Sequence, residues 1–119
     1  MPLYEALYLF LATGLVSMSA ALSAGALNKL PEEQRPAFMQ TPNGVVAVVM
    51  LGNLAALTLI GALAYGIRHM SWWIPLSCVF ITFPVIHIVV IQRVLGDMKA
   101  LLLMSPLVVA SIVALWYFW

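Results

Sequence analysis

The chain has 119 residues, a formal net charge of +1 at pH 7 and a single cysteine. Hydrophobic residues make up 65% of it and charged residues 8%, against about 25% charged residues in soluble domains, so a water-soluble globular fold is excluded. The near-zero net charge leaves no basic patch for nucleic acid, and one cysteine cannot form an internal disulfide.

Four apolar runs follow one another along the chain: Leu3–Leu27, Val45–Ile67, Trp72–Ile91 and Met98–Trp119. Each run has about 20 residues or more, which is enough for a helix to cross the hydrocarbon core of a bilayer. The sequence therefore predicts an all-α membrane protein, with residues 1–119 forming one bundle of four transmembrane helices and short loops. The expected partners are the lipid bilayer and other transmembrane helices.

The first run is interpreted as a retained transmembrane helix rather than a cleaved signal peptide. Glu5 stands where a signal peptide carries positive charge, and the apolar stretch is longer than a signal peptide needs.

Basic residues are unevenly shared between the two sides of the predicted bundle. The connections 28–44 and 92–97, with their flanks, carry Lys29, Arg35, Arg93 and Lys99, whereas the opposite side carries only Arg68. By the positive-inside rule, both connections face the cytoplasm and both termini face outward. We expect a bacterial inner membrane, because the chain is short and shows no targeting feature.

Capping and turn residues divide the connections. Pro31–Gln34 resembles the start of a short surface helix, and Thr41 followed by Pro42 predicts the capped start of the second span. Gly96 is expected to make the turn before the fourth span, with Asp97 as its N-cap.

Tryptophan and tyrosine gather at the side of the termini, as expected for residues of a membrane interface. They are Tyr4, Tyr8, Tyr65, Trp72, Trp73, Trp116, Tyr117 and Trp119. Glu5 and Arg68 lie at the same predicted interface, where we expect them to form an ion pair.

Two prolines lie inside predicted spans, Pro84 in the third and Pro106 in the fourth. Each removes one backbone hydrogen bond, so both helices should bend there. We interpret the bends as packing kinks; a hinge or a cavity is the alternative.

Small residues recur at helical spacing in the first two spans. They are Gly14, Ser17 and Ala21 in the first span and Gly52, Ala56 and Gly66 in the second. Such residues let transmembrane helices approach closely. They predict a tightly packed pair of helices, or equally a dimer face.

One polar residue of each span falls at a similar predicted depth: Ser19, Asn53, His87 and Ser105. At 1.5 Å of rise per residue, their depths differ by only about 4–5 Å. We interpret this layer as hydrogen bonding between helices. The alternative is a small-solute, proton or lipid-headgroup site centred on His87 and Asn53.

No metal or cofactor site is expected from the sequence. At 1.5 Å per residue, His87 lies close to 25 Å deeper in the membrane than His69, so the two histidines of one molecule cannot both bind one haem iron. An enzyme acting on lipid or quinone is the least favoured hypothesis, because Cys78 and His87 lie about 13 Å apart along one helix.

The four-span layout is shared by unrelated groups, including small multidrug exporters and fluoride channels. The acidic residue that the exporters carry in the middle of their first helix is absent here, so layout alone assigns no function. We expect a non-enzymatic accessory, regulatory or immunity-type subunit that acts through helix–helix association. The alternative is a homo-oligomeric channel or transporter for a small neutral or weakly charged solute.

Overall fold

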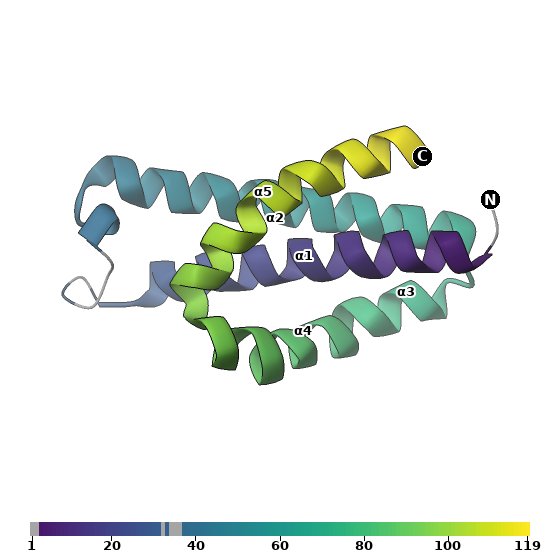
Figure 1. The fold of residues 1–119 in the computed structure, drawn as a ribbon, viewed down its shortest axis with the longest axis horizontal. Coiled ribbons are helices and arrows are strands. Elements are labelled where there is room, and N and C mark those ends of the chain that lie inside the picture. Colours follow the sequence, from purple (N-terminus) through teal and green to yellow (C-terminus); the bar gives the residue numbers. More distant parts are fainter. Residues whose placement is uncertain (1–2, 32, 34–36) are drawn as a thin grey trace.

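The computed structural model describes residues 3–31, 33 and 37–119. Within these ranges it contains four helices that are long and apolar enough to cross a membrane, which confirms the predicted all-α class (Figure 1). The longest dimension of the molecule is 48 Å, more than the hydrocarbon thickness of about 30 Å. The start of the first long helix and the C-terminus lie at one end of this axis, here called the terminal end, and the start of the second long helix lies at the other, the loop end.

The first, second and fourth crossings are long α-helices, whereas the third is assembled from short segments. Helix α1 comprises Leu3–Lys29 and α2 comprises Pro42–His69. The third crossing contains α3 (Trp73–Ser77), the π-helical η3 (Cys78–Thr82), α4 (Phe83–Ile86) and the π-helical η4 (His87–Ile91). It continues without interruption into α5 (Gln92–Phe118), whose larger part forms the fourth crossing.

The connection between α1 and α2 ends in the cap that the sequence predicts. Thr41 has extended backbone torsions and its side-chain oxygen accepts from the backbone N–H of Gly44 at 3.2 Å, with Pro42 as the first helical residue. A short 3₁₀ helix, η2 (Ala37–Gln40), precedes this cap. The surface helix expected at Pro31–Gln34 includes Glu32 and Gln34, which lie outside the described residues.

The turn between the third and fourth crossings is shorter than predicted. The predicted start of this connection at Gln92 was wrong. The helix continues from Gln92 to Leu95, because this segment contains no proline or glycine that would end it. The non-helical torsions fall on Gly96, with φ 74° and ψ 165°. The predicted cap role of Asp97 lies outside what the structure describes.

Pro84 and Pro106 have different surroundings in the backbone. Pro84 lies between the π-helical segments η3 and η4, and the N–H of Phe83 donates to the carbonyl of Cys78, five residues earlier. The wider π-helical turn accommodates the backbone hydrogen bond that is missing at Pro84, because proline has no N–H to donate. Pro106 lies inside α5, whose non-helical torsions fall on Gly96, so a bend at Pro106 stays a prediction.

Helix α1 is the central element of the bundle and packs most extensively against α2 and α5 (Figure 1). A Cβ built at Gly52 would lie 3.0 Å from the Cβ of Ala24, so α1 and α2 approach closely there. Gly14 instead accommodates Phe83 of α4, whose Cε2 would lie 2.5 Å from an added Cβ. The other small residues differ in burial: Ser17 and Gly66 are buried, Ala21 is half-buried and Ala56 is exposed.

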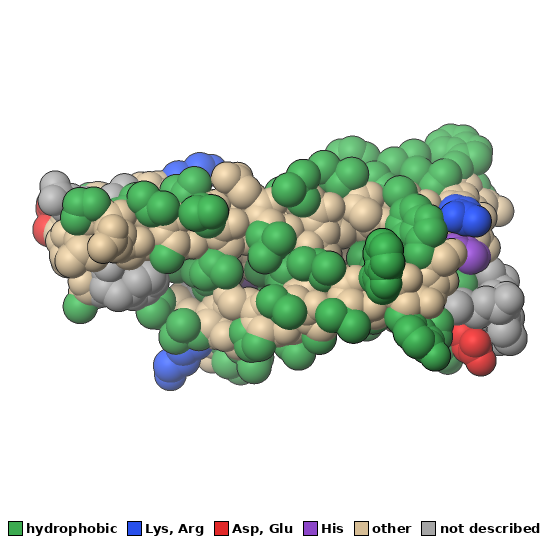
Figure 2. Space-filling model, turned by 90° about the horizontal axis from the view of Figure 1, so that it is seen from above, with side chains coloured by type: hydrophobic (Ala, Val, Ile, Leu, Met, Phe, Trp, Pro, Cys, Tyr) green, Lys and Arg blue, Asp and Glu red, His purple; other side chains and the backbone are tan. Residues whose placement is uncertain are grey.

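Two apolar clusters form the core. The cluster toward the terminal end includes Phe10, Tyr65 and Phe83, and the rings of Phe10 and Phe83 lie 5.5 Å apart. The cluster toward the loop end includes Ala24, Val48 and Leu101. Many large hydrophobic side chains remain exposed, and Figure 2 shows hydrophobic side chains along the whole length of one face of the molecule. This apolar exterior is the surface that a bilayer covers.

Candidate functional site

The four residues of the predicted polar layer differ in burial. Ser19 and His87 are buried and Ser105 is half-buried, but Asn53 is exposed on the outer face of α2. The buried side of α2 instead carries Val48, Ala55 and Thr58 among others. Within one chain, the exposed side chain of Asn53 and the buried side chain of His87 therefore have different surroundings, and the solute path expected from that pair stays a prediction.

Most intramembrane hydroxyls donate to the backbone of their own helix. The Oγ1 of Thr13 lies 2.7 Å from the carbonyl of Leu9, and the Oγ of Ser17 lies 2.7 Å from the carbonyl of Thr13. Thr58, Ser105 and Ser111 make the same bond to the residue four positions earlier. Such bonds satisfy a hydroxyl in an apolar medium without a partner helix.

Ser19 and Ser23 differ from these residues. Both are fully buried on α1, and their hydroxyl oxygens have no hydrogen-bond partner among the described residues. Their spacing of four residues places them on one face of the helix. The predicted depth of Ser19 singles it out in the sequence. Only the structure shows that Ser23 is also buried without a hydrogen-bond partner among the described residues.

His87 is 2% exposed and opens the second π-helical segment. Its backbone N–H donates to the carbonyls of Phe83 and Pro84, at the point where the helix passes from α4 to η4. A buried imidazole beside a widened helical turn is an arrangement often found at functional sites. Among the described residues, no group of three or more His, Cys, Asp or Glu side chains is placed to hold a metal ion.

Aromatic contacts organise the terminal end of α2. The Tyr65 ring lies 4.3 Å from that of His69 and 6.2 Å from that of Trp119. The guanidinium carbon of Arg68 lies 6.0 Å from the Trp119 ring, within the range of a cation–π interaction. The predicted ion pair of Arg68 with Glu5 is not found among the described residues, where Arg68 instead lies beside the Trp119 ring.

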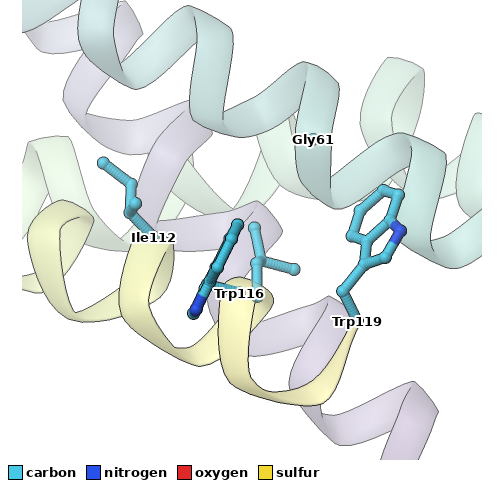
Figure 3. Close-up of a pocket in the computed structure, with 5 residues that line it drawn as sticks. Gly61, Ile112, Trp116 and Trp119 are labelled. Atoms are coloured by element: carbon cyan, nitrogen blue, oxygen red, sulfur yellow. The ribbon is translucent and has the colours of Figure 1, made fainter.

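The other predicted interfacial residues, Trp72, Trp73 and Trp116, are exposed near the same end. Trp116 and Trp119 also line an open apolar groove of about 580 Å³ between α2 and α5. Gly61 of α2 lies opposite Ile112 and Trp116 of α5 and the C-terminal Trp119 (Figure 3). Leu115 of α5 also lines the groove.

The groove continues toward the middle of the bundle. A second hollow of about 260 Å³ shares Gly61, Ile112 and Leu115 and extends to Leu54, Leu57 and Thr58. A Cβ added at Gly61 would meet nothing closer than Cδ1 of Leu115 at 3.9 Å, so this part of α2 is open. The sequence does not predict this groove. Polar and small residues mark positions along each helix, but they do not show which residues of α2 lie opposite which residues of α5.

These features define a class of protein: an integral membrane protein built as a four-helix bundle, with an apolar groove on its side. No protein-family model, curated protein or solved structure matches the chain.

Proposed function

We propose that this protein is a non-enzymatic subunit of a membrane complex, accessory, regulatory or immunity-type in role, that holds a transmembrane helix of a partner of different sequence in the groove between α2 and α5. The observation that carries the proposal is the groove itself, about 580 Å³ in volume and lined by Gly61 and apolar side chains. Helices associate in lipid through close packing, which small residues allow.

Trp116 supports a protein rather than an acyl chain as the occupant. It is 85% exposed at the rim of the groove, where its ring offers a large rigid contact area. Exposed tryptophan is a frequent anchor of protein interfaces. The hydroxyl of Thr58, which lines the continuation of this groove, donates to its own helix, which agrees with a packing role rather than a catalytic one.

The proposed location is a bacterial inner membrane, with the loop end in the cytoplasm and both termini outside. Lys29, Arg93 and Lys99 are exposed toward the loop end, and Arg68 lies at the terminal end. This distribution of charge favours the orientation by the positive-inside rule.

Position-specific photocrosslinking in native membranes tests the proposed function. A crosslinker replacing Ile112, which lines the groove, should capture one discrete polypeptide, whereas the same group at the neighbouring exposed Val113 should not. Trp116→Ala should reduce this capture about tenfold, a size typical of an interface anchor. Trp72→Ala is the matched control, because Trp72 is also exposed near the terminal end but does not line the groove.

The identity of the captured chain decides the outcome. A partner of different sequence, retained by Trp72→Ala and lost by Trp116→Ala, supports the proposal. Capture of lipid alone, capture of a second copy alone, or equal capture from Ile112 and Val113 overturns it.

A further inference from the structure

A seam of exposed residues runs along α2 on a face that no other helix of the bundle covers. Its members are Val46, Met50, Asn53, Leu57, Ile60 and Ala64, all of them exposed. Their intervals alternate between four and three residues, the spacing with which left-handed helix pairs interlock their side chains.

Asn53 is the polar member of this seam and lies deep in the membrane. At 1.5 Å per residue it is about 17 Å from the Pro42 end of α2 and about 24 Å from the His69 end. Asn53 makes no hydrogen bond to any described residue. In hydrocarbon, an amide without a partner is unfavourable, and asparagine in this setting commonly hydrogen-bonds across to another helix.

The chemistry of the amide favours a second copy of the same chain as the partner. A carboxamide carries both a donor and an acceptor, so it is complementary to itself. Copies threaded in the same direction place Asn53 at the same depth, and a two-fold axis along the membrane normal then brings each residue of the seam opposite its equivalent.

We propose that α2 forms a parallel homodimer through this seam, with the two Asn53 side chains hydrogen-bonded to each other. A single asparagine within an apolar heptad seam sets the register of two helices, because any shift leaves both amides unpaired. The seam borders the groove of the proposed function and shares Leu57 with its 260 Å³ continuation, but Gly61, Ile112 and Trp116, which line the groove, are not part of the seam. One surface can fail its test while the other passes.

Energy transfer between donor- and acceptor-labelled copies in liposomes, measured at rising lipid-to-protein ratio, tests the dimer. Asn53→Ala should raise the apparent dissociation constant about tenfold, the effect of losing one to two hydrogen bonds between membrane helices. Asn43→Ala is the matched control: it makes the same change in the same helix, but at the exposed first turn near the loop end. It should dissociate as the unmodified protein does.

Disulfide crosslinking in a Cys78→Ala background tests the surface separately. Ile60→Cys, on the seam, should form disulfide-linked dimers, whereas Ile81→Cys, exposed on the third crossing at a comparable depth, should not. Far-ultraviolet circular dichroism checks that each variant keeps its helices. Three results would overturn the proposal. Dilution could dissociate Asn53→Ala and the unmodified protein equally, dimers could form through Ile81→Cys instead, or Ile60→Cys could crosslink only to another polypeptide.

Discussion

Single glycines on α2 differ in what surrounds them, and this difference has a measurable consequence. A Cβ at Gly66 would lie 2.9 Å from Cδ1 of Phe10 and 2.9 Å from Cβ of Pro75, a rigid ring close to the backbone. Gly66→Ala should therefore lower the free energy of unfolding by about 1–3 kcal/mol, the usual cost of overpacking. Equilibrium unfolding in mixed detergent and SDS micelles, followed by circular dichroism, measures it.

Gly61→Ala is the control for this prediction, because it makes the same change on the same helix beside the open groove. Its nearest atom would be 3.9 Å away, so the variant should match the unmodified protein or gain up to about 1 kcal/mol from helix propensity. Equal destabilisation by both variants would show that Gly66 is not the tight contact that the structure describes.

Among whole elements, the sequence predicts which segments are helices better than it predicts which way they face. A segment that crosses lipid must satisfy its own backbone hydrogen bonds, so long apolar runs identify α1, α2 and α5 directly. The side that turns inward leaves a weaker pattern, because both lipid and core select apolar residues. Asn53 shows this limit: its depth follows from the sequence, but its place on the exposed face does not.

The helical irregularity near Pro84 was predictable only in part. Proline predicts a missing hydrogen bond at that point, but not that two π-helical segments, Cys78–Thr82 and His87–Ile91, accommodate it. Nothing in the sequence indicates the groove at Gly61 either, since it depends on how obliquely α5 crosses α2. The turn at Gly96 was predictable, because glycine is the residue that tolerates such torsions.

The turn between the third and fourth crossings rests on the backbone freedom of Gly96. Its φ of 74° and ψ of 165° belong to a region that is almost exclusive to glycine, although an added Cβ would meet nothing within 4 Å. Gly96→Ala should cost about 1–3 kcal/mol of unfolding free energy through torsional strain alone. The same SDS titration measures this cost.

Gly25→Ala is the control for the turn, because Gly25 is helical and an added Cβ there also meets nothing within 4 Å. It should be neutral or raise stability by up to about 1 kcal/mol. A Gly96→Ala variant as stable as Gly25→Ala would contradict the strained turn.

At the scale of the whole molecule, the arrangement of the two ends leads to a prediction about threading. The structure places the start of α1 and the C-terminus at one end, while η2 lies at the other. In the proposed orientation, a cysteine at Ser71, exposed near the terminal end, should react with a membrane-impermeant maleimide in intact cells. A cysteine at Ala37, exposed in η2, should react only after permeabilisation; both variants need a Cys78→Ala background.

The pattern of labelling also bears on the dimer. If only Ala37→Cys is labelled in intact cells, the protein has the opposite orientation. All copies are then still parallel, so the seam could still pair. Partial labelling of both variants would mean that copies insert in both directions. In an antiparallel pair the two Asn53 side chains would be offset by about 7 Å along the membrane normal, too far for one hydrogen bond, because Asn53 is not at the midpoint of α2. A single orientation is therefore a condition that the Asn53 contact requires, and the labelling experiment tests it independently of any dimer.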